Sequence, residues 1–167
     1  MAFFVPENLG CLSADLGPVV AMHGGFTYVG KVRGQGRPRF RRNGTAYETK
    51  EDADFKRALA NAYRDQCGLW FGEGPLYVAV TVMRHLPKST PKRIRSEPDT
   101  MKPDADNIAK AVLDALNGVA YADDKQVVIL ESRKFPRVRF DDDSDRLRIT
   151  IADVGIDTIY PYLFDVE

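Results

Sequence analysis

Length, composition and charge limit the size of the fold and exclude few classes of partner. The chain has 167 residues, enough for one domain with a sizeable core and too few for a second large domain. Lys plus Arg and Asp plus Glu are equal at 24 each, so net charge alone gives no reason to expect nucleic acid or an acidic membrane surface as a partner.

The N-terminal segment and the cysteines argue against export. Residues 1–22 have no basic start, and Pro6 and Pro18 interrupt their apolar runs, so we expect neither a signal peptide nor a membrane-spanning helix. Cys11 and Cys67 are too few for a disulfide framework. A reduced, cytoplasmic protein without a membrane partner is therefore expected.

Strands and a first helix are predicted from residue type and spacing. β-branched and aromatic residues favour strands over residues 26–32, 75–85, 125–135 and 146–154. A turn or hairpin is expected over residues 34–40. Thr49 is the predicted start of a helix that Gly68 ends. The apolar face of that helix consists of Phe55, Leu59, Ala62 and Tyr63.

Charge is segregated along the chain although its total is zero. Basic residues gather in residues 31–50 and 84–95, and acidic residues gather in 102–128 and 141–145. Each run alone is typical of a solvated loop, but two basic segments beside an acidic cluster favour a polyanion that is gripped by its phosphates and acted on at the acidic site. The candidate phosphate contacts are Arg37, Arg39, Arg41, Arg42, Lys92, Arg93 and Arg95.

The segment KPDADNIAKAVLDALNGVAYADDKQVV, residues 102–128, has the most specific pattern. Pro103 favours an extended lead-in, so Asp104 and Asp106 can point the same way. Asp106 is expected to cap the following helix, and Lys110 lies one turn further along the same side. The helix is predicted from its apolar stripe and its stop signal, which are Ile108, Ala111, Val112, Ala115 and Leu116, then Asn117 and Gly118.

A loop with two adjacent aspartates connects this helix to the next strand. We expect the strand to return beside the start of the helix, so that Asp123 or Asp124 approaches Asp104 and Asp106. Converging carboxylates form the hard-oxygen site that Mg²⁺ or Mn²⁺ prefers. Each aspartate alone could simply cap a helix or form a turn. Together with Lys110 and the basic segments, the set favours a metal site that acts on phosphate.

Residues 102–128 resemble the signature of the RusA-type Holliday junction resolvases, which are endodeoxyribonucleases of phages and bacteria. The shared features are a D-x-D-N start, a Lys four residues after the second Asp, an A-L-N-G helix end and a D-D-x-Q-V run that leads into a strand. A softer resemblance covers residues 26–154. It implies a small α+β fold, a single domain with a mixed β-sheet and two main helices, that acts as a homodimer.

The resemblance also implies roles for individual residues. It makes Asp104, Asp106 and Asp124 the catalytic metal ligands, Lys110 the catalytic lysine and Asp123 an adjacent metal-binding carboxylate. The expected activity is Mg²⁺-dependent cleavage, with Mn²⁺ as the alternative ion, of two opposed strands of a four-way DNA junction during recombination or repair. The nuclease domain would span residues 23–154, between an N-terminal extension, residues 1–22, and a C-terminal tail, residues 155–167.

Two other functions are compatible with these residues. A D-x-D motif near Mg²⁺ also occurs in metal-dependent phosphohydrolases of nucleotides, although a small substrate would not need the basic segments. A non-catalytic DNA-binding module would use the aspartates only as caps and turns, and its DNA binding would be the same in chelator as in Mg²⁺.

Overall fold

The structure is a computed structural model that describes residues 22–36, 39–40, 42–44 and 46–155. The largest sheet has four strands in the order β1, β8, β4, β6. Their bounds are β1 His23–Val29, β4 Leu76–Met83, β6 Val127–Lys134 and β8 Arg146–Asp153. β1 and β4 both pair antiparallel with β8, whereas β4 and β6 are parallel. The sheet is therefore mixed, as expected.

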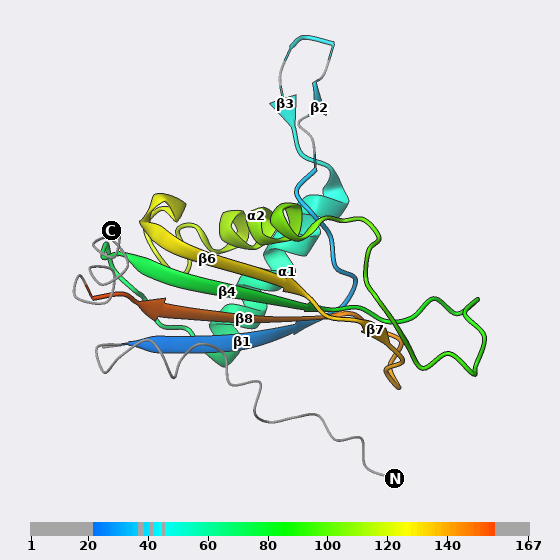
Figure 1. Ribbon diagram of the computed structural model, residues 1–167. Helices are drawn as coiled ribbons and strands as arrows, with labels where there is room; N and C mark the ends of the chain where they lie inside the picture. The colour runs from blue at the N-terminus through cyan, green and yellow to red at the C-terminus, as the bar shows by residue number, and fades with distance from the viewer. Residues whose placement is uncertain (1–21, 37–38, 41, 45, 156–167) are drawn as a thin grey trace, which may run out of the picture.

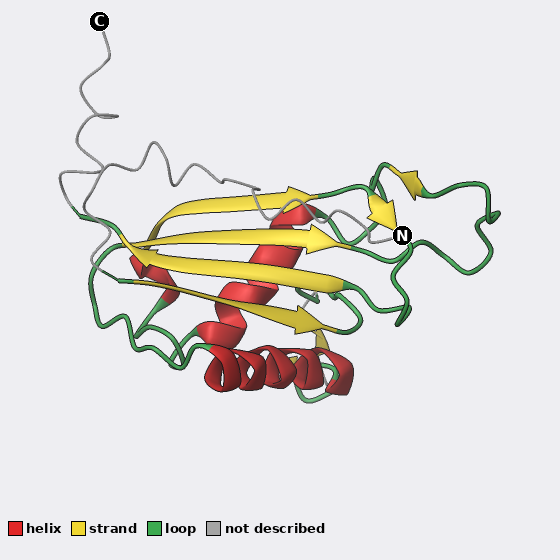
Figure 2. Ribbon diagram, turned by 90° about the horizontal axis from the view of Figure 1, so that it is seen from below, coloured by secondary structure: helices red, strands yellow, loops and turns green. Residues whose placement is uncertain are grey.

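Two helices cover one face of this sheet (Figure 2). The first, α1 (Lys50–Gln66), begins as predicted: the Thr49 side chain accepts a hydrogen bond from the backbone N–H of Asp52. After the helix, Gly68 adopts a positive φ of 66°, a conformation that costs glycine little. The second, α2 (Ala105–Leu116), has Asn117 as its C-cap. The α+β class with two main helices is confirmed.

The core lies between the helices and the sheet. The predicted apolar stripes of both helices face inward because residues three or four apart share one side of a helix. Side chains that are fully buried there include Leu59 of α1, Ile108 and Val112 of α2, Val78 and Val82 of β4, and Ile149 of β8. The opposite face of the sheet has a smaller buried cluster of Tyr77, Ala79, Ala152 and Val154.

Two short ribbons project from the body of the fold (Figure 1). The hairpin arm consists of β2 (Arg39–Phe40) and β3 (Ala46–Tyr47). The other ribbon pairs β5 (Ser96–Glu97) with β7 (Arg137–Val138) and closes the basic loop, residues 84–100. The second ribbon was not predicted, because two-residue strands leave no periodic pattern in the sequence.

The first strand begins and ends three residues before its predicted limits. Beyond Val29, Gly30 has a φ of 150° and donates its backbone N–H to the carbonyl of Asp145 at 3.0 Å, which turns the chain away from the sheet. The other three strands lie within one or two residues of their predicted limits. No helix in the described part of the chain is long and apolar enough to cross a membrane.

Candidate functional site

Asp104 and Asp106 stand at the beginning of α2. Asp104, rather than Asp106, is the N-cap residue, so the predicted position of the cap was wrong by two residues. The Asp104 side chain makes no capping hydrogen bond, and Asp106 lies in the first helical turn. Both side chains are exposed. Two exposed carboxylates, of which Asp104 makes no capping hydrogen bond, thus lie where the helix dipole favours negative charge.

The backbone on either side of Asp104 is held by side chains from one strand. Lys134, the last residue of β6, donates from Nζ to the carbonyl of Pro103 at 3.0 Å. Ser132, also in β6, donates from Oγ to the carbonyl of Ala105 at 2.8 Å. The end of β6 therefore lies beside the beginning of α2.

Asp123 and Asp124 lie near the other end of α2, so the expected convergence with Asp104 and Asp106 is not formed within the chain. Asp124 opens the short helix η2 (Asp124–Gln126), which leads directly into the first residue of β6. Since β6 ends beside the start of α2, its first residues lie roughly one helix length away, about 18 Å for the 12 residues of α2.

The reason is the parallel pairing of β4 and β6. A helix that connects two parallel strands runs back against their direction, so the second strand begins near the end of the helix. Figure 1 shows β6 running along α2 in this way. Among the described residues, no three His, Cys, Asp or Glu side chains are grouped so that they could hold a metal ion.

The side chain of Asp123 forms hydrogen bonds within its own turn, and the carboxylate of Asp124 lies near the ring of Tyr121. The Asp123 side chain accepts a hydrogen bond from the backbone N–H of Lys125 at 3.0 Å, and Gln126 Oε1 accepts from the Asp123 N–H at 2.9 Å. These two bonds form a capping box, so Asp123 has the turn-forming role that is the alternative to a ligand role. Burial and the nearby Asp124 carboxylate raise the pKa of Tyr121.

The predicted lysine and the basic residues are exposed wherever the structure describes their side chains. Lys110 is exposed on α2, one turn after Asp106, and it makes no ion pair with the described residues. Exposed side chains without an ion pair in the described part of the chain are also found at Arg42, Lys92, Arg93 and Arg95. Arg39 is placed in β2. Arg37 and Arg41 lie outside the described residues.

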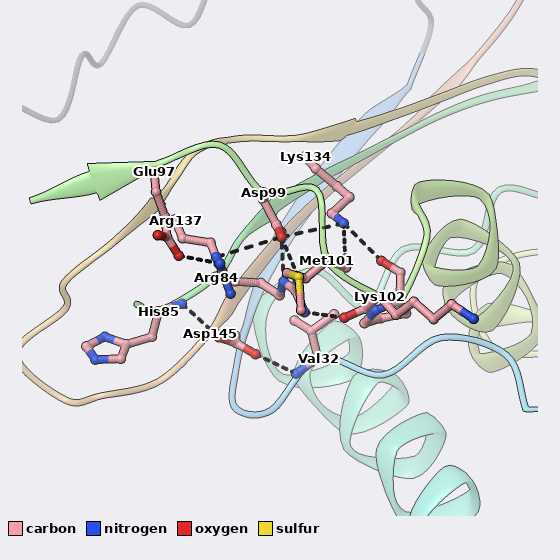
Figure 3. A network of polar contacts seen from close by, with 11 residues as sticks. Val32, Arg84, His85, Glu97, Asp99, Met101, Lys102, Lys134, Arg137 and Asp145 are labelled. Atoms are coloured by element: carbon pink, nitrogen blue, oxygen red, sulfur yellow. Dashed lines mark hydrogen bonds and ion pairs between the residues drawn. The ribbon is translucent and has the colours of Figure 1, made fainter. Parts of the chain in front are cut away.

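A buried ionic network that no sequence pattern indicated lies beside the site and is centred on Asp99 (Figure 3). The Asp99 side chain is 0% exposed and pairs with Arg84, whose Nε donates to Oδ2 at 2.7 Å. Lys134 Nζ and Arg137 Nε lie 3.6 and 4.0 Å from Oδ1. Arg84 belongs to the basic segment 84–95, yet its side chain is only 12% exposed. A single Asp in a loop belongs to no repeating sequence pattern, so the sequence does not indicate that Asp99 is buried among cations.

The network sets the ionisation of Asp99. Burial alone would raise the pKa of this carboxyl, but the Arg84 hydrogen bonds and the charges of Arg84 and Lys134 outweigh it and hold the pKa below its usual range. A depressed pKa contributes stability above the unfolded-state pKa of about 3.9, and that stability is lost as pH falls through the folded-state value.

Replacing Asp99 with Asn should therefore flatten the acid side of the stability profile. Urea melts between pH 7 and pH 2 should show a smaller fall in the free energy of unfolding for the variant than for the wild type. The matched control is Asp54→Asn in α1, which removes an exposed pair with Arg57 and should leave the acid slope almost unchanged. Equal slopes for wild type and Asp99→Asn would contradict the assignment.

Comparison with known proteins gives the family. The profile of endodeoxyribonuclease RusA matches residues 30–152, which include Asp104 and Asp106, the basic loop and all of α2. The chain belongs to the RusA endodeoxyribonuclease family. It is also 37% identical over 131 residues to the uncharacterized protein YqaN of Bacillus subtilis (strain 168), an alignment that covers 68% of this chain and 90% of that protein. The family acts on branched DNA junctions, and its nucleases usually use divalent metals.

Proposed function

We propose that the protein is a Mg²⁺-dependent endonuclease that resolves four-way DNA junctions by paired, symmetric nicks. The observation that carries this proposal is the position of Asp104 and Asp106 at the end of the fold from which the hairpin arm and the basic loop project (Figure 1). Exposed cations on projecting arms suit the phosphate backbone, and backbone contacts favour recognition of branch shape over base sequence.

The donor set at the start of α2 fits a hard divalent ion. Mg²⁺ is commonly held by one or two carboxylates and keeps several waters, so Asp104 and Asp106 are sufficient as a first pair of ligands. A bound ion there would lower the pKa of a water and neutralise charge on the phosphate. Lys110 would add positive charge beside the scissile phosphate from the next turn of α2.

The distance between Asp124 and the pair Asp104 and Asp106 supports assembly as a dimer. In a two-fold dimer, any contact from one subunit to its partner is repeated in reverse, so each Asp124 could complete the partner's site. In the described sheet, β6 is an edge strand, and Val128 and Leu130 on it are 51% and 46% exposed. An unpaired strand edge with apolar side chains is suited to cover by a second copy.

Antiparallel pairing of the two β6 edges would bring the carboxylates together. In such a pair, opposed residue numbers have a constant sum, so a register with Val128 opposite the partner's Leu130 sets Asp124 close to the partner's Lys134. Lys134 donates to the carbonyl of Pro103, the residue before Asp104. We infer that Asp124 acts in the partner's site. A monomer in sedimentation at working concentration, with full paired cleavage, would contradict this assembly.

The basic loop should account for part of the salt dependence of binding. Replacing Lys92, Arg93 and Arg95 together with Ala should weaken junction binding and reduce the slope of log affinity against log salt by about 0.9 for each phosphate that is no longer neutralised. Gel shifts in chelator over a range of salt concentrations measure this slope. The control is Arg57→Ala with Arg64→Ala on the exposed face of α1, where each side chain bonds to its own helix. An unchanged slope in the triple variant would assign the loop to folding or solubility.

A substrate panel separates the proposal from its alternatives. We expect the protein with Mg²⁺ to nick a four-way junction and to leave free nucleotides intact, and we expect junction binding to persist in chelator while cleavage stops. Hydrolysis of nucleotides without cleavage of branched DNA would instead identify a nucleotide phosphohydrolase. Junction binding without cleavage in either Mg²⁺ or Mn²⁺ would identify a non-catalytic DNA-binding module.

A further inference from the structure

The loop that leads into α2 is tied to the fold through its backbone carbonyls. Arg84 donates from Nη1 to the carbonyl of Lys102 at 2.7 Å and from Nη2 to that of Met101 at 3.0 Å. Lys134 donates from Nζ to the carbonyls of Met101 at 2.6 Å and Pro103 at 3.0 Å. Three consecutive carbonyls, immediately before Asp104, are thus held by two cations.

The same two cations converge on Asp99 (Figure 3). Its carboxylate, with no exposed surface, receives a forked pair of hydrogen bonds from Arg84, which fixes the orientation of that guanidinium. The Lys134 ammonium lies 3.6 Å from the same carboxylate. A long cationic side chain loses many rotamers when it is held, and a buried counter-charge is what compensates for its lost hydration. Among the described residues, Asp99 is the only carboxylate that forms an ion pair with Arg84 or Lys134, whereas Asp145 acts on Arg84 only through the charge of its carboxylate.

The opposite side of this loop is also closed. The backbone N–H of Gln35 donates to the carbonyl of Asn107 at 2.8 Å, and Gly34 packs so closely that an added Cβ would lie 2.8 Å from Pro103 Cβ. The lead-in and first turn of α2 are therefore clamped between the loop after β1 and the Asp99 network. The segment that carries Asp104 and Asp106 has little room to shift.

We propose that Asp99, Arg84 and Lys134 are positioning residues for Asp104 and Asp106, with Asp99 holding the two cations that fix the carbonyls of residues 101–103. This inference rests on the proposed metal-dependent function. In this role the three residues act on the backbone of the loop and not directly on the metal or the phosphate. Their effect is on the affinity and placement of the ion, because groups that orient metal ligands change metal affinity or activity by about 10- to 100-fold when they are removed.

The test is a Mn²⁺ titration of the full chain without DNA, followed by the spectroscopic signal of the free ion. Asp99→Asn keeps the shape of the side chain and removes the charge that holds Arg84 and Lys134. Lys134→Met keeps an apolar stem of similar length and removes the donors to Met101 and Pro103 without removing the Arg84–Asp99 pair. We expect both variants to bind Mn²⁺ about 10-fold more weakly than the wild type. Both should also need more Mg²⁺ for half-maximal cleavage while binding junction DNA normally.

Two controls make the outcomes distinct. Asp54→Asn, an exposed carboxylate on α1, should bind Mn²⁺ as the wild type does, and Asp104→Asn should lose most of the binding. If Asp99→Asn or Lys134→Met folds and binds Mn²⁺ with wild-type affinity, the positioning role is overturned but the proposed metal site is not. If Asp99→Asn does not fold, Lys134→Met decides by the same criterion. Wild-type Mn²⁺ affinity in Asp104→Asn, or no binding by the wild type, would overturn the proposed metal site and the positioning role with it.

Discussion

Asp106→Asn should reduce cleavage of a four-way junction by more than about 100-fold, the upper limit for losing a group that only supports a metal ligand. The substitution removes one carboxylate of the proposed pair and leaves the backbone unchanged. Binding to the junction should persist, or become tighter, because the charge that repels phosphate is reduced. Gel shift and cleavage on the same labelled junction measure both effects.

Stability supplies a second, independent readout for the same variant. Asp106 lies in the first turn of α2, where a negative charge gains about 0.3–1 kcal/mol from the helix dipole, but Asp104 opposes it. Glu51→Gln in α1 is the matched control, because Glu51 also lies in a first turn and makes no proposed metal contact. In chelator, Asp106→Asn should lose less stability than Glu51→Gln. Added Mg²⁺ should stabilise the wild type more than Asp106→Asn. Normal cleavage by Asp106→Asn would contradict the proposed metal site.

Mixed dimers should show whether each site draws on both subunits. We expect Asp104→Asn and Asp124→Asn to be inactive as separate proteins. A dimer with one subunit of each kind, isolated by two different affinity tags, would carry one site with both substitutions and one site with none. Such a dimer should nick a single strand of each junction, because an isologous interface repeats every contact in both directions.

The matched control for this experiment is a mixed dimer of Asp104→Asn with Asp106→Asn. Those two substitutions lie on one side of the proposed subunit boundary, so both sites stay damaged and no nicking should return. If the mixed dimer of Asp104→Asn with Asp124→Asn is as inactive as this control dimer, the idea of a site shared between subunits is contradicted. Wild-type paired nicking by Asp124→Asn alone would show that this carboxylate is not a ligand.

Local patterns were sufficient to predict most of the fold. The α1 helix begins after Thr49 and α2 ends at Leu116, because capping and stop signals act within a few residues of the element they limit. The predicted strand at residues 75–85 is β4, which lies between β8 and β6, and its nearly continuous apolar run is typical of a strand in the interior of a sheet. The ribbon pairs β5 with β7, which are far apart in the sequence and have only two residues each. No local pattern in the sequence indicates that pairing.

The site was only partly predictable, because its geometry depends on how distant elements run relative to one another. Asp104 and Asp106 were found from their own spacing and from the helix that follows them. The position of Asp124 depended on the direction of β6, which is set by its parallel pairing with β4. Asp99 and Lys134 are separated by α2 in the sequence and meet only in the folded protein, so nothing local to either residue indicated their pairing.

The most direct test of the central claim uses a synthetic four-way junction with each of its four strands labelled in turn. In Mg²⁺, we expect the protein to nick two opposed strands at symmetric positions near the crossover and a ligase to seal the products. Chelator should abolish the nicks. A linear duplex of the same sequence should remain largely uncut. Cleavage of the duplex at the same rate, or unchanged cleavage in chelator, would contradict a metal-dependent junction resolvase.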